Sequence, residues 1–141
     1  MKRVSTRIAW FLLISILLVY VPGCGQHKRS RSLRQEKSQI VKVEICSYDG
    51  HEKSTLLVLS DFETEKLLLD LSRIESFEYF PGDHPREYGE KIICIHYANN
   101  EIEVIGETNI GWISQSGQWH LTRYSYEWGA ISTLIAQYMG V

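Results

Sequence analysis

An uncharged apolar run near the start of the chain limits where a folded core can form. Residues 8–21 are 14 residues without a charge, and residues 24–38 are rich in Lys, Arg, Ser and Gln, with Leu33 as the one large aliphatic side chain. An apolar helix without a polar face does not suit the surface of a soluble domain. A polar stretch of the second kind buries too little apolar surface to fold by itself. The sequence therefore predicts a single folded domain, over residues 39–141.

The first 23 residues have the layout of a secretory signal. Three basic residues precede the apolar run, which is shorter than the roughly 20 residues of a membrane-spanning helix. The run ends in Val21-Pro22-Gly23-Cys24. This ending resembles the lipobox of bacterial lipoproteins, in which an aliphatic residue three places before the cysteine and a small residue directly before it precede a cysteine that becomes lipidated. Pro22 departs from that pattern.

The resemblance implies a signal peptide over residues 1–23, lipidation of Cys24, and a lipid-anchored position on the extracytoplasmic face of the cell membrane. An uncleaved signal anchor and an apolar core helix of a cytoplasmic protein are the alternatives. Residues 24–38 predict a basic, flexible tether with a net charge of +4. Beside a lipid anchor, such a tether is attracted to anionic headgroups, although a plain soluble spacer fits the same composition.

The charge of the remaining chain has the opposite sign. From Gln39 onward there are 7 basic and 16 acidic residues, a net charge of −9. Nucleic-acid binding depends largely on Lys and Arg neutralising phosphates, so we expect no nucleic-acid partner. An acidic domain favours a partner with a basic surface.

The first part of this domain alternates as a strand and then turns into a helix. In residues 40–46, Val41, Val43 and Ile45 alternate with polar side chains, which predicts a half-buried strand. A turn over residues 48–51 and a returning strand over residues 55–59 complete a hairpin. Ser60 and Glu63 have the spacing of a capping box, which predicts a helix up to about residue 72. Its expected apolar face consists of Phe62, Leu67, Leu68, Leu69 and Leu71.

The second part reads as further hairpins followed by a second helix. Residues 74–80 alternate weakly, and the prolines of residues 81–85 exclude regular structure there. Residues 91–97 and 101–105 form a hairpin across Asn99-Asn100, and residues 111–114 pair with residues 119–124. A helix is expected over residues 126–139, with Trp128, Ile131, Leu134, Ile135 and Tyr138 on one face and Gly140 as its C-cap. The pattern predicts an α+β fold, an antiparallel β-sheet built from hairpins with two helices packed on one face.

Few residues suggest chemistry. Cys46 and Cys94 are expected in strands, either as a disulfide or as two separate buried thiols. His51, His84, His96 and His120 are scattered without metal-ligand spacing, so neither a metal nor a cofactor is expected. No nucleophile elbow or phosphate-binding loop is present, and no catalytic residue can be nominated.

Aromatic side chains gather near the C-terminus. The last 30 residues contain six of them, namely Trp112, Trp119, Tyr124, Tyr126, Trp128 and Tyr138. Their simplest role is the core beneath the last helix, and Trp112, Trp119 and Tyr126 are candidates for a binding surface because Trp and Tyr are frequent in interfaces.

The domain also resembles small uncharacterised lipoproteins of Gram-positive type, although it carries no specific motif of theirs. We therefore expect a noncatalytic, membrane-anchored lipoprotein that binds a protein or an envelope component. The alternatives are a small hydrolase-like envelope enzyme with a spatially assembled site, and an inhibitor or immunity-type protein.

Overall fold

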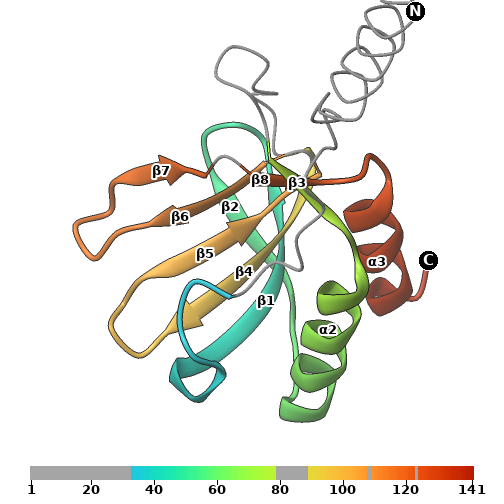
Figure 1. Cartoon of the computed structure of the whole chain (residues 1–141), viewed down its shortest axis with the longest axis horizontal. Coiled ribbons are helices and arrows are strands. Elements are labelled where there is room, and N and C mark those ends of the chain that lie inside the picture. The colour runs from blue at the N-terminus through green and yellow to red at the C-terminus, as the bar shows by residue number, and fades with distance from the viewer. Residues whose placement is uncertain (1–32, 79–88, 108, 123) are drawn as a thin grey trace, which may run out of the picture.

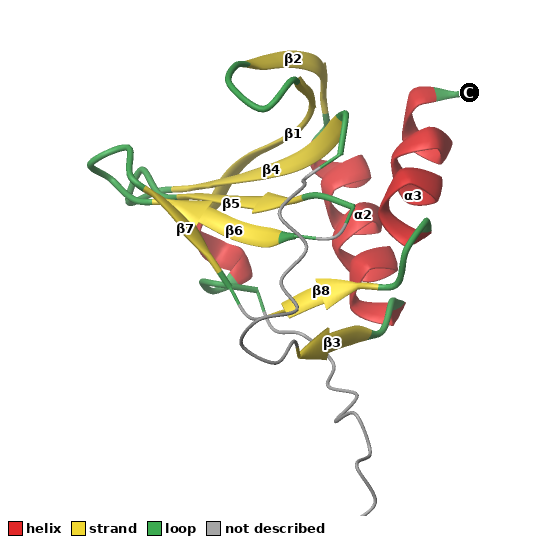
Figure 2. Ribbon diagram, turned by 90° about the horizontal axis from the view of Figure 1, so that it is seen from above, coloured by secondary structure: helices red, strands yellow, loops and turns green. Residues whose placement is uncertain are grey.

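The computed structural model describes residues 33–78, 89–107, 109–122 and 124–141 (Figure 1). The predicted signal peptide, Cys24 and residues 81–85 lie outside these ranges. Within them the chain forms a six-stranded sheet, a two-stranded sheet and two α-helices, with all strand pairs antiparallel. The predicted α+β class is confirmed, and Figure 2 shows both helices on the same side of the large sheet.

The large sheet has the strand order β2-β1-β4-β5-β6-β7. Its strands, in chain order, are β1 (Ile40–Tyr48), β2 (Lys53–Val58), β4 (Lys91–Tyr97), β5 (Ile102–Ile105), β6 (Ile110–Ile113) and β7 (Trp119–Leu121). The turn between β4 and β5 contains Asn100 with a φ of 64°, a conformation that Asn tolerates better than most residues. The turn predicted at Asn99-Asn100 is therefore confirmed.

The first helix, α2 (Asp61–Arg73), begins where the sequence predicts. Ser60 Oγ accepts a hydrogen bond from the Glu63 backbone N–H at 3.3 Å, and the Glu63 carboxylate accepts one from the Ser60 N–H at 2.8 Å. This reciprocal capping box satisfies two N–H groups that the helix itself leaves unpaired. The apolar face is narrower than predicted, because Phe62 and Leu69 are 78% and 51% exposed.

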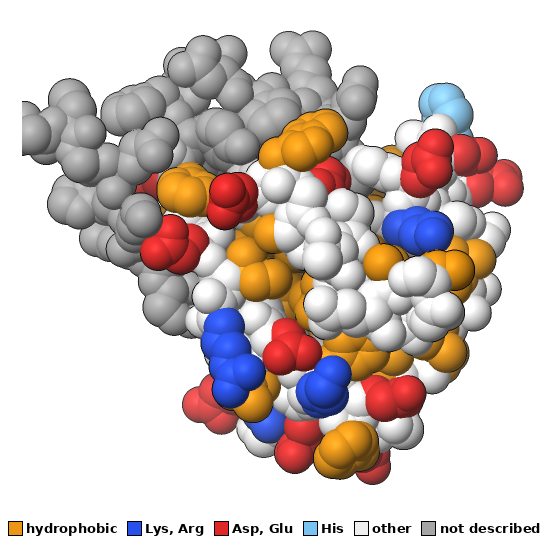
Figure 3. Space-filling view, turned by 90° about the vertical axis from the view of Figure 1, so that its right-hand side faces the viewer, with side chains coloured by type: hydrophobic (Ala, Val, Ile, Leu, Met, Phe, Trp, Pro, Cys, Tyr) orange, Lys and Arg blue, Asp and Glu red, His pale blue; other side chains and the backbone are white. Residues whose placement is uncertain are grey.

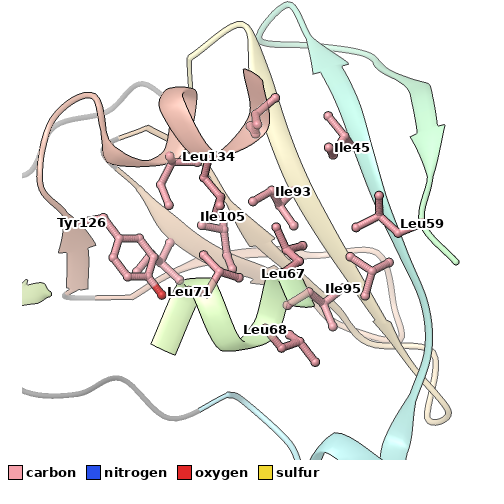
Figure 4. Close-up of a cluster of buried hydrophobic side chains, with 14 of the residues drawn as sticks. Ile45, Leu59, Leu67, Leu68, Leu71, Ile93, Ile95, Ile105, Tyr126 and Leu134 are labelled. Carbon is pink, nitrogen blue, oxygen red and sulfur yellow. The ribbon is translucent and has the colours of Figure 1, made fainter. Parts of the chain in front are cut away.

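The main core lies between the two helices and the sheet (Figure 4). Paired strand residues point to the same face of a sheet, so β1 and β4 turn one set of side chains to the helices. The buried residues that form this core are Val43, Ile45, Leu59, Leu67, Leu68, Leu71, Ile93, Ile95, Tyr97, Ile105, Ile110, Tyr126, Ile131, Leu134 and Ile135. At about 25 cal/mol per Å² of buried apolar surface, a core of this kind is the main source of stability.

A smaller apolar cluster lies on the other face of the sheet, which we call the outer face. Cys46, Ile92, Cys94 and Val104 form this cluster and are completely buried. The ring of Tyr48 in β1 lies 5.8 Å from the ring of Trp119 in β7, although three strands separate these two in the sheet. Such a contact requires a strongly coiled sheet, and the coiling helps to enclose the cluster.

Two predictions about the C-terminal part are wrong. The strand expected over residues 119–124 is divided into β7 and β8 (Tyr124–Tyr126), and β8 pairs with β3 (Ser76–Glu78) in the separate two-stranded sheet. The second helix, α3 (Ala130–Met139), begins four residues later than expected, after Gly129 with a φ of 83°. A left-handed residue cannot continue an α-helix, so Tyr126 and Trp128 lie outside it. The expected end at Gly140 is confirmed.

The last part of the predicted tether is also different from the expectation. Residues 33–39, which include a 3-10 helix (η1, Lys37–Gln39), lie against the domain. Leu33 packs against the main core, and the Gln35 side chain donates a hydrogen bond to Glu101 at 2.7 Å. Residues 33–38 therefore belong to the folded part of the chain and not to a free spacer.

Candidate functional site

The outer face carries a buried carboxylate that four side chains surround. Glu44 in β1 is 2% exposed. Its Oε1 accepts hydrogen bonds from Lys53 Nζ at 2.9 Å and from His96 Nε2 at 2.6 Å. Its Oε2 accepts from Lys42 Nζ at 3.1 Å and from Thr55 Oγ1 at 2.9 Å. This network connects the strands β1, β2 and β4 through side chains as well as through the backbone.

The charges in this network fix its protonation state. Burial alone would raise the pKa of Glu44, but the hydrogen bonds from Lys53, His96 and Lys42 outweigh it and hold that pKa far below its usual range. Burial lowers the pKa of His96 despite its bond to Glu44. Near neutral pH the Glu44 carboxylate is therefore ionised and the His96 imidazole is neutral.

The pair of His96 and Glu44 has one feature that is useful in catalysis. A neutral imidazole that donates from Nε2 to a carboxylate keeps Nδ1 as a proton acceptor. A hydrolase of this type also needs an activated nucleophile. The nearest thiol in the pairing register, Cys94, is completely buried, and its hydrogen bond with Cys46 and its burial raise its pKa. The network therefore serves the architecture of the sheet better than it serves nucleophilic catalysis.

Cys46 and Cys94 are free thiols in the structure. The disulfide that the sequence left open is not formed, and the alternative of buried thiols describes what is seen. In the pairing register Cys46 lies opposite Ile92, and Cys94 lies opposite Glu44, so the two thiols are diagonal neighbours. Both belong to the small apolar cluster of the outer face, where cysteine packs as a small hydrophobic residue.

The three aromatic residues proposed for a binding surface do not lie together. Tyr126 is 4% exposed and belongs to the main core, because β8 directs it inward, so its assignment to the surface is wrong. Trp119 is 41% exposed but rests against Tyr48. Trp112 is half-buried and already carries partners of its own.

Those partners of Trp112 connect the N-terminal segment to the sheet. The Arg34 guanidinium lies 3.4 Å from the centre of the Trp112 ring, a cation–π contact, and His120 stacks on Trp112 with a centroid separation of 4.0 Å. Arg34 Nε also lies 3.2 Å from Glu101 Oε2, and the backbone N–H of Arg34 donates a hydrogen bond to the carboxylate of buried Glu103 at 3.1 Å. These contacts of Arg34 therefore hold the N-terminal segment against the sheet.

Trp128 is the most exposed tryptophan among the described residues. Its side chain is 78% exposed, and no hydrogen bond or ring contact involves it in the part of the chain that the structure describes. Its spacing from Ile131 and Leu134 in the sequence predicts a place on the buried face of a helix, and this prediction is wrong. Gly129, the next residue, is the feature of the sequence that indicates a later start of the helix, because glycine is frequent at helix ends.

The backbone around Trp128 is held by a carboxylate from a distant turn. Gly129, the N-cap of α3, has no side chain that can cap the helix. Glu107, between β5 and β6, replaces that function, because its carboxylate accepts hydrogen bonds from the N–H groups of Gly129 and Ser132, the latter at 2.9 Å. A negative charge here also complements the positive end of the helix dipole.

The described residues contain neither a metal site nor a membrane-spanning helix. Among the described residues, no group of three or more His, Cys, Asp or Glu side chains is arranged to hold a metal ion. No helix within the same ranges is both long and apolar enough to cross a membrane.

Comparison with known proteins gives no relative for this chain: no protein family, no curated protein and no solved structure matches it.

Proposed function

We propose that this chain is a lipid-anchored protein of the extracytoplasmic membrane face, and that its acidic domain binds a protein or an envelope component without catalysing a reaction. The observation that carries the proposal is the sequence Val21-Pro22-Gly23-Cys24 after a short apolar run. That sequence resembles the lipobox of bacterial lipoproteins. Acylation with two or more chains would hold the protein firmly, whereas a single chain gives only marginal attachment.

The packing of residues 33–38 gives the proposal a length scale. Cys24 precedes Leu33, the first residue packed on the domain, by nine residues. Fully extended, nine residues span at most about 30 Å. A lipid at Cys24 would therefore keep the domain within roughly its own diameter of the bilayer, and a partner would have to be reached there.

The acidity of the domain supports a binding role and indicates the kind of partner. A net charge of −9 from Gln39 onward gives a field that attracts basic surfaces and repels anionic lipid. Lys28, Arg29 and Arg31, close to the proposed anchor, have the opposite preference. This division of charge would keep the acidic domain turned toward solvent and toward proteins.

The proposal is tested by the mass and location of the mature protein. We expect the full chain to fractionate with membranes, and its intact mass to correspond to a polypeptide that begins at an acylated Cys24. Cys24→Ser should remove the acyl mass and release the protein from the membrane fraction. Cys46→Ala, which removes a different thiol, is the matched control and should stay attached.

The opposite result is equally clear. An unmodified chain that retains Met1 and remains in the cytosol would refute both the anchor and the location.

A further inference from the structure

We propose that Trp128 and the two hollows beside it form the docking surface for a basic protein segment, with an arginine of the partner packed on the indole ring. The inference rests on the proposed binding function and names the surface and the partner that this function would use. It begins from the exposure of Trp128, which is the largest among the tryptophans of the described chain.

The ring of Trp128 is exposed while its backbone is fixed. Glu107 binds the N–H of the next residue, Gly129, and the Ala130 N–H donates to the Glu127 carbonyl at 3.1 Å. Tyr126, two residues earlier, is buried in the main core. An aromatic side chain on a backbone that is already ordered loses little freedom when a partner covers it, which is the property of an interface anchor.

Trp128 stands between two open hollows on either side of α3. One has a volume of about 370 Å³ and is lined by Trp128 together with Glu90, Lys91, Glu107, Ser132 and Ala136. The other has a volume of about 510 Å³ and includes among its lining residues Asp70, Arg73, Ile74, Glu127, Thr133 and Gln137. Figure 3 shows the side of the molecule formed by α2 and α3, where separate hydrophobic areas lie among charged side chains. Each hollow can receive a side chain of a partner that covers the indole.

Charge decides which partner fits. Two carboxylates in these hollows are already used, since Glu107 caps α3 and Asp70 accepts a hydrogen bond from Tyr138 at 3.1 Å. Glu90 and Glu127 are exposed, one in each hollow, and neither forms an ion pair with a residue in the described ranges. Each hollow also contains one cation, Lys91 or Arg73, against two carboxylates, so each hollow keeps an excess of negative charge. An indole beside such hollows suits a cation that stacks on the ring and pairs with Glu90 or Glu127, and the planar guanidinium of arginine does both.

The same charges disfavour a membrane as the occupant. Trp is also frequent at lipid interfaces, but the net charge from Gln39 onward is −9 and Glu127 lines the same hollow as Trp128. Anionic headgroups would be repelled by this surface. A basic protein segment is therefore the occupant that the charges select.

The experiment uses the full chain in detergent micelles and a short synthetic peptide of alternating arginine and glycine as the probe. We expect saturable binding, weakened by salt, and a dissociation constant about fivefold larger for Trp128→Ala. Phe62→Ala is the matched control, because Phe62 is equally exposed at 78% but lies at the start of α2. Glu127→Gln should weaken binding, whereas Glu65→Gln, at an exposed position on α2, should not.

Two results would overturn the proposal. One is equal affinity of Trp128→Ala and Phe62→Ala for the arginine peptide, or equal affinity of the wild type for a peptide with glutamate in place of arginine. The other is a change in Trp128 fluorescence, taken as wild type minus Trp128→Ala, that anionic lipid added to the micelles causes and the peptide does not. Unchanged thermal unfolding of Trp128→Ala shows that the variant is folded.

Failure of this surface is distinguishable from failure of the proposed function. If Trp128→Ala binds like the wild type while the protein carries acyl chains and fractionates with membranes, only the surface is wrong. If the protein is an unmodified cytosolic chain, the proposed function is wrong whatever the peptide does.

Discussion

Replacing Glu44 with glutamine gives the most direct test of the outer-face network. The variant keeps the shape of the side chain but removes its charge and converts one acceptor oxygen into an NH₂ donor. Two of the four donors around Glu44 then lose their acceptor. Each charge-assisted hydrogen bond contributes about 1.5 to 3 kcal/mol. Lys42 is 41% exposed and can turn into water, so we take the lower value for each of the two lost bonds. The free energy of unfolding should then fall by about 3 kcal/mol in total.

The assay is urea denaturation near neutral pH, followed by circular dichroism. The matched control is Glu65→Gln, whose side chain is 70% exposed and pairs, within the described residues, with one exposed lysine. This control should leave the free energy of unfolding unchanged within error, because surface ion pairs contribute little. For a domain of this size, a loss of about 3 kcal/mol lowers the midpoint of thermal unfolding by roughly 10 °C or more.

The pH dependence separates the charge from the shape. The pKa of Glu44 is lower in the folded protein than in the unfolded chain. Its contribution to stability is therefore fully present above the unfolded value of about 4.3 and is lost as the pH falls through the folded value. The difference between wild type and Glu44→Gln should be largest near neutral pH and should shrink on acidification below about pH 4. A difference that stays constant over this range, or a variant as stable as Glu65→Gln, would refute the reasoning.

Four other predictions follow from single contacts. Glu107→Ala removes the acceptor for the first turn of α3 and should lower the free energy of unfolding by about 1 kcal/mol in urea denaturation; unchanged stability would contradict the capping role. Arg34→Ala should speed hydrogen exchange across residues 33–39, and equal exchange rates would show that other contacts hold this segment. Cys46 and Cys94 should resist alkylation in the native protein and react after denaturation, as measured by mass, because both are completely buried. Burial lowers the pKa of His96 in the folded protein, so its contribution to stability is present only above the pKa of about 6.5 that it has in the unfolded chain. We therefore expect the wild type to lose stability as the pH falls below about 6.5, and His96→Asn to lose less. An equal dependence of stability on pH in both proteins would contradict this prediction.

Much of the fold follows from local patterns along the chain. Alternation around Val43 predicts β1, and the spacing of Ser60 and Glu63 predicts the start of α2, because each pattern depends on neighbours within a few residues. The Asn99-Asn100 turn belongs to the same class. The start of α3 could not be predicted in this way. The helical spacing of apolar residues extends from Tyr126 and Trp128 into the helix, but the backbone at Gly129 lies outside the helical region.

The candidate site was less accessible to such patterns. Glu44 has the appearance of a polar residue on a solvent-facing strand surface, but coiling of the sheet and donors from β2 and β4 bury it. The sequence suggests that Trp112 and Trp119 are available to a partner, but Arg34 lies over the ring of Trp112 and Tyr48 lies against the ring of Trp119. These contacts join residues far apart in the chain, and no local spacing encodes them.

The sequence alone determined the division of this protein into an apolar stretch, a basic stretch and an acidic α+β domain, because charge and periodicity are properties of the residues themselves. Only the tertiary structure decided that residues 33–38 join the domain, that Glu44 is buried with its donors, and that Trp128 is the most exposed tryptophan of the described ranges. The physical reason is that burial depends on which surfaces meet after the sheet coils, and those surfaces come from strands and helices that are distant in the sequence.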